Sequence, residues 1–77
     1  MSKRYYLIAQ YFPGKGQTAE NPECLFGTGS YAVSFPPRGI KETCCYISKK
    51  RAENYAAKCN GFYRYSRFAV CDVTDMI

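Results

Sequence analysis

The sequence predicts a small α+β fold, in which one helix packs on a three- to four-stranded, mainly antiparallel sheet. Strand-forming residues dominate 3–12, 30–35 and 62–73, and a helical repeat of apolar residues follows a good N-cap at Ser48. Pairs of Pro, Gly and Asn residues separate these segments. With 77 residues, the chain has room for a single domain spanning 1–77. The expected order of elements is β-β-(β)-α-β.

The first strand is expected over residues 3–12, which end at the turn pair Pro13-Gly14. Its two faces would carry Tyr5, Leu7, Ala9 and Tyr11 on one side and Tyr6, Ile8, Gln10 and Phe12 on the other. Because both faces are largely apolar, we expect this strand to lie at the centre of the sheet.

The segment between this strand and the helix is predicted to hold a loop and one or two short strands. Residues 14–29 are rich in Gly, Lys, Gln, Thr, Asn and Pro, which is typical of a long loop. Residues 30–35 alternate apolar and small side chains and stop at Pro36-Pro37, so an edge strand is expected there. Residues 42–47 predict a third strand more weakly.

The helix is the most clearly indicated element. Ser48 is a suitable N-cap, and the following apolar residues recur at i, i+3, i+4 and i+7 on one face. These residues are Ala52, Tyr55, Ala56 and Cys59. Asn60-Gly61 would end the helix, and the small Ala and Cys residues indicate close packing against the sheet.

The last strand is expected over 62–73, in a central position like the first strand. Neither of its faces is cleanly apolar, which leaves two interpretations open. A bulge near Ser66-Arg67 could turn Tyr65 and Phe68 inward together, or the tyrosines could stand on an open face of the sheet.

The composition indicates a folded chain that contains free thiols. Hydrophobic residues make up 47%, and the thirteen aromatic residues include eight tyrosines, which can pack a ring while leaving the hydroxyl in water. Five cysteines is an odd number, so we expect reduced and mostly buried thiols rather than a disulfide framework. No pair of cysteines is separated by two to four residues and no histidine occurs, and we therefore expect neither a metal site nor a cofactor. No apolar run reaches eighteen residues and no signal-peptide pattern opens the chain, which predicts a cytoplasmic protein without a membrane segment.

The excess positive charge of the chain is local. Residues 49–67 contain six bases and one acid, which gives +5, and this equals the net charge of the whole chain. The bases are Lys49, Lys50, Arg51, Lys58, Arg64 and Arg67, and the acid is Glu53. A local field of one sign indicates an anionic partner, such as nucleic acid, an acidic protein surface or a phosphate.

The first candidate site is the beginning of the helix. Lys49, Lys50 and Arg51 occupy its first turn, where the helix dipole makes cations unfavourable by about 0.3 to 1 kcal/mol each. Together with Ser48 Oγ and free backbone N–H groups, they could form a seat for a phosphate or a carboxylate. The alternative is a cluster of bases that only faces solvent.

The second candidate site is the run of alternating aromatic and basic residues from 62 to 68, which is preceded by Lys58. On an exposed sheet face, Tyr63, Arg64, Tyr65 and Arg67 could stack on nucleic-acid bases and contact phosphates. The alternative is that core aromatic residues alternate with solvent-facing arginines, as in any half-buried strand.

Enzymatic chemistry is poorly supported, because no histidine is present and the six carboxylates are scattered. We therefore expect a non-enzymatic binding protein. Its partner would be a larger protein or nucleoprotein complex with an acidic or phosphate-bearing surface. Direct binding of nucleic acid by the same residues is the alternative, and a small enzyme or redox protein that uses the cysteines comes third.

In size and layout the chain resembles the small α+β accessory proteins of bacteriophages and mobile elements, including anti-CRISPR inhibitors. The resemblance is one of architecture over the whole chain, and the basic helix differs from inhibitors that mimic DNA with acidic surfaces. It implies a phage-encoded protein that docks on a host complex, such as nucleic-acid-handling CRISPR-type machinery, and inhibits or modulates it.

Overall fold

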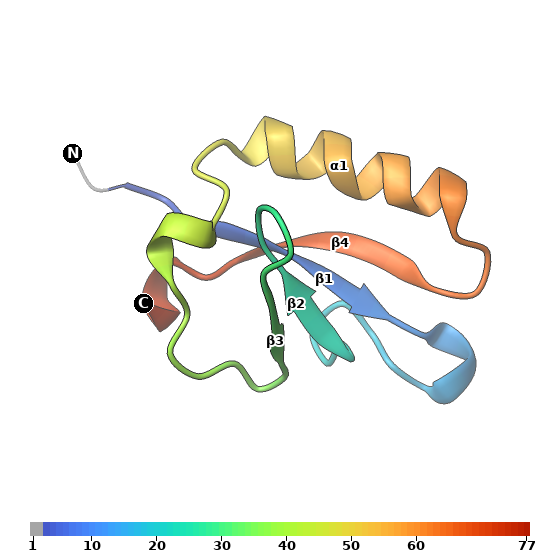
Figure 1. Ribbon diagram of the computed structural model, residues 1–77. Coiled ribbons are helices and arrows are strands. Elements are labelled where there is room, and N and C mark those ends of the chain that lie inside the picture. Colours follow the sequence, from blue (N-terminus) through green and yellow to red (C-terminus); the bar gives the residue numbers. More distant parts are fainter. Residues whose placement is uncertain (1–2) are drawn as a thin grey trace.

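The computed structural model describes residues 3–77 and shows one α-helix packed on a four-stranded antiparallel sheet (Figure 1). The elements are β1 (Tyr6–Tyr11), β2 (Cys24–Phe26), β3 (Ala32–Ser34), α1 (Lys49–Phe62) and β4 (Arg67–Asp72), with short 3-10 helices at Pro13–Lys15, Glu42–Cys44 and Thr74–Met76. The strand order is β3-β2-β1-β4. The predicted α+β class is confirmed. The expectation about a signal peptide partly concerns Met1 and Ser2, which lie outside the described residues.

Strand β1 is the centre of the molecule, as its sequence predicts. It pairs with β2 on one side and with β4 on the other, and Leu7, Ile8 and Ala9 are buried almost completely. Ile8 packs toward α1 in a cluster with Ala52 and Phe68. Leu7 and Ala9 point to the opposite face, so both faces of β1 are covered.

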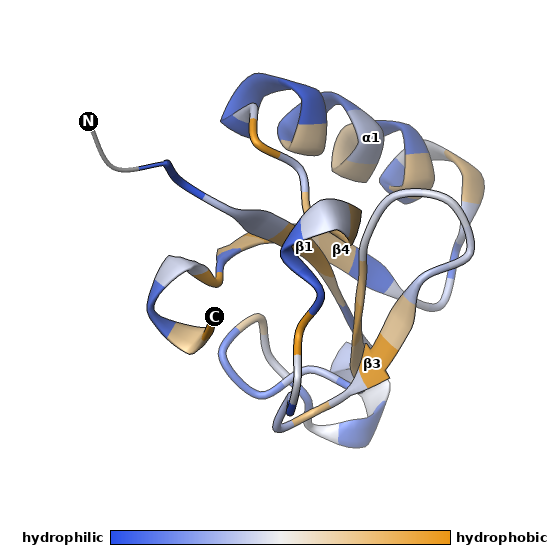
Figure 2. Ribbon diagram, turned by 60° about the vertical axis from the view of Figure 1, so that its left-hand side comes forward, coloured by the Kyte–Doolittle hydropathy of each residue, from blue (hydrophilic) through white to orange (hydrophobic). Residues whose placement is uncertain are grey.

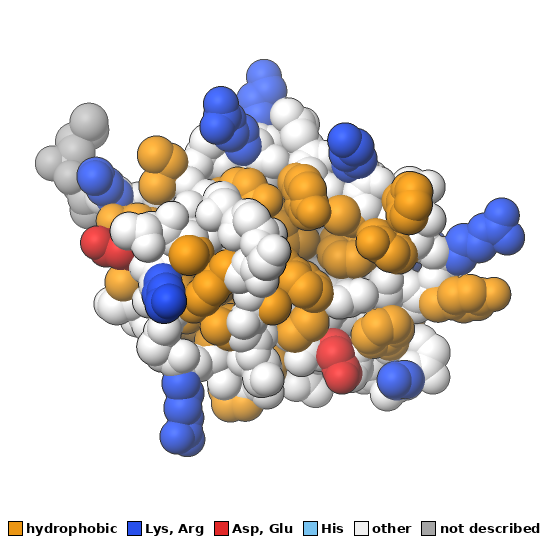
Figure 3. Space-filling model, viewed as in Figure 1, with side chains coloured by type: hydrophobic (Ala, Val, Ile, Leu, Met, Phe, Trp, Pro, Cys, Tyr) orange, Lys and Arg blue, Asp and Glu red, His pale blue; other side chains and the backbone are white. Residues whose placement is uncertain are grey.

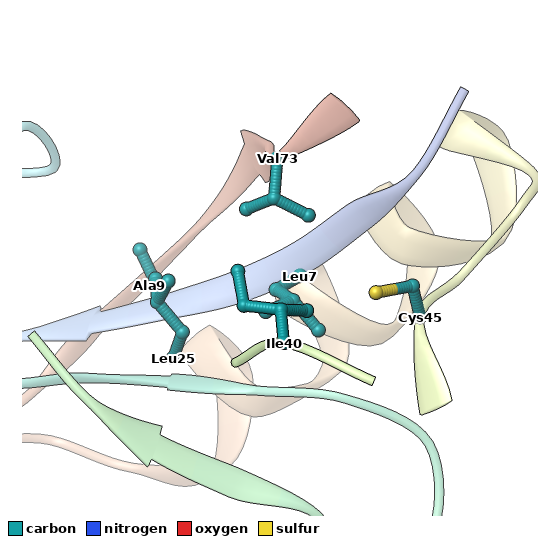
Figure 4. Packing of buried hydrophobic residues seen from close by; sticks show 6 residues of the cluster. All are labelled: Leu7, Ala9, Leu25, Ile40, Cys45 and Val73. Carbon is teal, nitrogen blue, oxygen red and sulfur yellow. The ribbon is translucent and has the colours of Figure 1, made fainter. Parts of the chain in front are cut away.

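The face of the sheet opposite α1 is covered by the chain that leads from β3 to the helix. Ile40 and Cys45, from this connection, pack with Leu7 and Val73 in the second cluster (Figure 4). Gly27 lies where this connection passes β2, and a Cβ at this position would clash with the carbonyl oxygen of Cys44. The connection therefore substitutes for a second helix layer and requires a residue without a side chain at position 27.

Helix α1 begins where the sequence predicts. The Ser48 side chain accepts a hydrogen bond from the Arg51 backbone N–H at 3.3 Å, and Ala52 and Ala56 are buried against the sheet. The outer side of the helix is hydrophilic along most of its length (Figure 2). The predicted end at Asn60-Gly61 is wrong by one residue, because Gly61 stays helical and the helix ends at Phe62.

Two segments between β1 and α1 differ from the prediction. Strand β2 lies inside the segment expected to be a loop, where three residues pair with β1 and β3. Residues 42–44 form a 3-10 helix instead of a third strand, although Tyr46 makes a single bridge to Tyr6 with backbone bonds of 2.8 and 2.9 Å. Strand β3 is at an edge, as expected.

Strand β4 is shorter than predicted and lies at the other edge of the sheet, not at its centre. Its register against β1 is regular from Tyr6–Asp72 to Tyr11–Arg67, so no bulge interrupts it. The aromatic residues before Arg67 belong to the helix end and to the connection that follows it. Both interpretations of the tyrosines are therefore wrong, because neither Tyr63 nor Tyr65 belongs to a strand.

Asn60 ties the end of α1 to the outer edge of β4. Its side-chain NH2 group donates to the Phe68 carbonyl at 2.9 Å, and its side-chain oxygen accepts from the Phe68 N–H at 2.8 Å. The amide thus provides the same two hydrogen bonds as a neighbouring strand would. It satisfies both backbone groups of a residue whose side chain is in the core.

We expect the Asn60→Ala substitution to lower the free energy of unfolding by about 1–3 kcal/mol, because it leaves two partly buried backbone groups of Phe68 without partners. Urea denaturation followed by circular dichroism would measure the change. Asn54→Ala is the matched control, because Asn54 lies exposed in the same helix and should change stability by only a few tenths of a kcal/mol. Equal effects of the two substitutions would contradict this role for Asn60.

Candidate functional site

The three bases in the first turn of α1 do not converge on one anion site. Successive residues of an α-helix project about 100° apart. Lys49 lines a hollow beside β4 together with Glu53, whereas Arg51 lines a different hollow together with Ser48 and Thr28. Lys50 lies exposed between them. The structure therefore separates the residues that the sequence suggested as a common seat.

These bases are nevertheless not neutralised within the chain. Among residues 3–77 the single ion pair joins Arg4 to Asp72 at 3.4 Å, far from the start of α1 in the sequence. The first turn of the helix contains no acid. Its positive charge is therefore available to a partner.

One side of α1 combines basic and aromatic side chains. Arg51, Tyr55, Lys58 and Phe62 are spaced at i, i+4, i+7 and i+11, so they form one line along the helix, which we call the α1 stripe. All four are exposed, Tyr55 by 48% and Phe62 by 78%. A contiguous exposed apolar patch, in contrast to single exposed residues, is typical of an interaction surface.

An apolar groove lies between the α1 stripe and the strands β1 and β2. It consists of two adjoining hollows of about 180 and 230 Å³, which share Tyr55, Cys59 and Tyr63 as walls. Ile8, Phe26 and Phe68 line its deeper part. Hydrophobic side chains gather between the helix and the sheet on this side of the molecule (Figure 3). We call this feature the aromatic groove.

The charge on the helix side of the aromatic groove has one sign. No acidic residue lines either hollow, as far as residues 3–77 are concerned, and Lys58 lines one of them. Lys and Arg side chains follow the helix above the groove, while acidic side chains are seen only away from the helix (Figure 3). An apolar surface with a positive rim is therefore presented to solvent.

The connection between α1 and β4 extends this surface. Tyr63 is held by ring contacts with Phe62 at 5.1 Å and with Phe68 at 5.5 Å between centroids. Tyr65 is 87% exposed, and the neighbouring Arg64 is also exposed. Arg67 differs, because strand alternation places its side chain on the face of β4 that points away from α1.

The structure thus keeps part of the predicted site and changes its centre. Of the predicted residues, Arg51, Lys58 and Tyr63 lie along the groove and stripe, Arg64 and Tyr65 are in the adjacent connection, and Ser48 borders the hollow at the helix start. Lys49, Lys50 and Arg67 lie elsewhere. Tyr55 was expected on the buried face of the helix, and Phe62 was expected only as part of the 62–68 strand run. The spacing from Arg51 to Phe62 already indicated a second line along the helix.

The pKa values of two phenols at the groove are raised. The Cys59 thiol, one helical turn away, raises the pKa of Tyr55 above its ordinary value. Burial raises the pKa of Tyr46, whose ring lies 6.2 Å from that of Tyr55. Neither phenol therefore adds negative charge to this surface, which keeps the positive rim intact.

The five cysteines are free thiols, and burial raises the pKa of Cys24, Cys45 and Cys71. Thiolate, the nucleophilic form, is therefore scarce at these three positions near pH 7. In the part of the chain that the structure describes, no group of three or more His, Cys, Asp and Glu residues could hold a metal ion. Residues 3–77 also contain no helix with the length and apolar character needed to cross a membrane.

Comparison with known proteins found no matching family model, no similar curated protein and no similar solved structure. The fold and the surface define a small α+β protein with an exposed aromatic groove and a positive rim. Arguments about its function therefore rest on that surface.

We expect all five thiols to react with Ellman's reagent in denaturant, whereas Cys24, Cys45 and Cys71 should react more slowly than free cysteine in the native protein at pH 7. A raised pKa lowers the thiolate fraction at any given pH, so these rates should rise as the pH is increased past 9. Alkylation followed by mass spectrometry would assign the rate to each residue. Native rates equal to that of free cysteine at these three positions would contradict the expectation.

Proposed function

We propose that this protein is a non-enzymatic binding protein that docks on a larger protein or nucleoprotein complex through the aromatic groove and the α1 stripe. The observation that carries the proposal is the alternation of exposed bases and aromatic residues along one side of α1, next to an apolar groove. Docking on an acidic surface would bury these side chains and neutralise the local excess of charge.

The groove suits a protein partner because aromatic rings wall its deeper part, where Gln10 adds a polar group that can form a hydrogen bond. An aliphatic or aromatic side chain entering the groove would contact the accessible edges of Phe26 and Phe68 and the Tyr55 and Tyr63 rings beside them. Tyrosine and arginine are also enriched among the residues that dominate binding energy at protein interfaces. The positive rim then favours a partner whose apolar side chain is flanked by carboxylates.

Such docking would inhibit or modulate the partner, because a chain of 77 residues can act by covering a functional surface. Its size and its layout of one helix on a small sheet are similar to those of the phage accessory proteins that it resembles. We therefore extend the proposal to a phage-encoded inhibitor of a nucleic-acid-handling complex in the cytoplasm. This extension is supported by the architecture and by the positive surface.

Direct binding of single-stranded nucleic acid is the second candidate, and a specific observation favours it. Tyr65 and Phe62 present rings that are 87% and 78% exposed, and Arg64 and Lys58 are close to them in sequence. Exposed aromatic rings can stack on unpaired nucleobases while nearby basic side chains contact the phosphates.

We expect replacement of Arg51 and Lys58 by Gln to weaken the partner complex about two- to thirtyfold, since each exposed ionic contact contributes about 0.2–1 kcal/mol. The matched control replaces Lys49 and Lys50 by Gln. It removes the same charge from the same helix but leaves the α1 stripe unchanged. The measurement is quantitative capture from extracts of cells that express the protein, with and without nuclease treatment, followed by binding assays on the captured partner.

Equal loss in both double variants would show that only net charge matters and would reject the α1 stripe as the docking surface. Retention that survives nuclease supports a protein partner. Retention that nuclease abolishes, with affinity for a mixed-sequence single-stranded oligonucleotide that falls steeply with salt, supports the second candidate instead.

We also expect Phe62→Ser to weaken the same complex by tenfold or more, because it removes an exposed ring that is a candidate for a dominant contact. Its effect on the free energy of unfolding should be small, since the ring is 78% exposed in the free protein. Titration calorimetry and urea denaturation would measure the two quantities. A variant that unfolds more easily but binds as the wild type does would identify Phe62 as a structural residue.

A further inference from the structure

The outer edge of β4 is open beyond the position that Asn60 occupies. The backbone N–H and C=O groups of Phe68 bond to Asn60 and therefore point away from β1. The Val73 N–H, in contrast, bonds to the Tyr5 carbonyl on the β1 side. Alternation along the strand then directs the backbone groups of Val70 and Asp72 outward. No residue between 3 and 77 bonds to them. Unpaired strand edges are templates for pairing with another chain.

We propose that β4 pairs with β4 of a second copy of this chain, antiparallel and around a two-fold axis at Cys71. The register follows from which outward backbone groups of β4 already have a hydrogen-bond partner. Asn60 blocks Phe68, and the Thr74 N–H is taken by the Asp72 side chain at 2.9 Å. The two-fold pairing that uses both open positions joins Val70 of each copy to Asp72 of the other. Cys71 then lies directly opposite Cys71 of the second copy.

The side chains beside this edge favour a second copy over a foreign strand. A hollow of about 400 Å³ runs between α1 and β4, and its helix side presents Lys49, Glu53, Ala56 and Ala57. The mixed charges differ from the single sign on the helix side of the aromatic groove. A two-fold axis would bring the flanks with Lys49 and Glu53 together in opposite directions, so that unlike charges meet. The small alanines leave room for the second helix.

The proposed dimer and the docking surface use different sides of the helix. Lys49 and Glu53 project roughly opposite the α1 stripe, as the helical spacing requires. A dimer would therefore present two aromatic grooves at once. Salt should affect the two processes differently. It weakens docking on an anionic partner, whereas for the dimer it screens both the repulsion between two chains of net charge +5 and the attraction between Lys49 and Glu53, so that its net effect there is smaller.

The first test is oxidation of the native protein with diamide. In a non-hydrogen-bonded antiparallel pair the Cα atoms are about 4.5 Å apart, within the range that a disulfide can bridge. The two Cys71 thiols would form one S–S bond, and diamide would take up the two electrons and two protons. We expect wild type and Cys59→Ser to give a covalent dimer in electrophoresis without reductant, and Cys71→Ser to give none. A dimer that persists in Cys71→Ser would overturn the proposed register.

The second test is sedimentation equilibrium of Val70→Pro and Val70→Thr. Proline removes the outward N–H of residue 70, and this N–H makes no hydrogen bond to β1. The monomer should therefore tolerate proline at this edge position, whereas the dimer would lose a hydrogen bond between the two copies. Threonine keeps the N–H. We expect Val70→Thr and wild type to approach twice the monomer mass of 8.8 kDa, and Val70→Pro to remain at 8.8 kDa with an unchanged circular dichroism spectrum.

The wild-type result decides the proposal even if Val70→Pro does not fold. A wild-type chain that stays at 8.8 kDa up to about 1 mM protein, at low and high salt, would overturn it and leave the edge to an extended segment of another protein.

Discussion

The burial of β1 on both of its faces is the constraint on which the rest of this structure depends. A single helix of about 10 Å diameter covers roughly two strands spaced about 4.8 Å apart. Here α1 lies over β4 and β1, and it leaves the part of the sheet near β2 without a helix above it. The other face is closed by the connection that carries Ile40 and Cys45. The aromatic groove is thus a geometric consequence of covering a four-stranded sheet with one helix.

Because the groove follows from the fold, its chemical character follows from the residues that border the uncovered area. Ile8 is fully buried beneath the groove, whereas the Tyr55 and Tyr63 rings that border it stay about half exposed. Chains of this length bury only about 60% of the surface that they expose when unfolded. A partner that covers the groove would add to the burial that the short chain cannot complete alone, which links the marginal size of the core to a role in binding.

Periodicity in the sequence was sufficient where local pattern and tertiary burial agree. The apolar faces of residues 5–12 correctly predicted a central strand, and Ser48 correctly predicted the start of the helix. Strand β2 could not be predicted, since three residues carry no period and their pairing depends on β1 and β3. The edge position of β4 was also hidden, because α1 and Asn60 supply the burial and the hydrogen bonds that a neighbouring strand would give. The tyrosines of the connection were expected in the strand because aromatic residues have a high strand propensity. Adjacent bases at 49–51 looked like one site because sequence proximity does not show direction around a helix.

The charge distribution around α1 divides the helix into two different surfaces. Three cations in a first helical turn oppose the helix dipole, and no acid of residues 3–77 compensates them by an ion pair. On the side of Lys49, Glu53 is present in the same hollow, so this flank contains both signs and is complementary to itself. On the side of Arg51 and Lys58, the basic residues alternate with exposed rings, and no acid lines the groove among the described residues. This flank is therefore complementary to an anionic partner and not to itself. A helix selected only to cover the sheet would need neither arrangement. The Ser48 cap, the buried Ala52 and Ala56 and the Asn60 clamp already hold α1 in place.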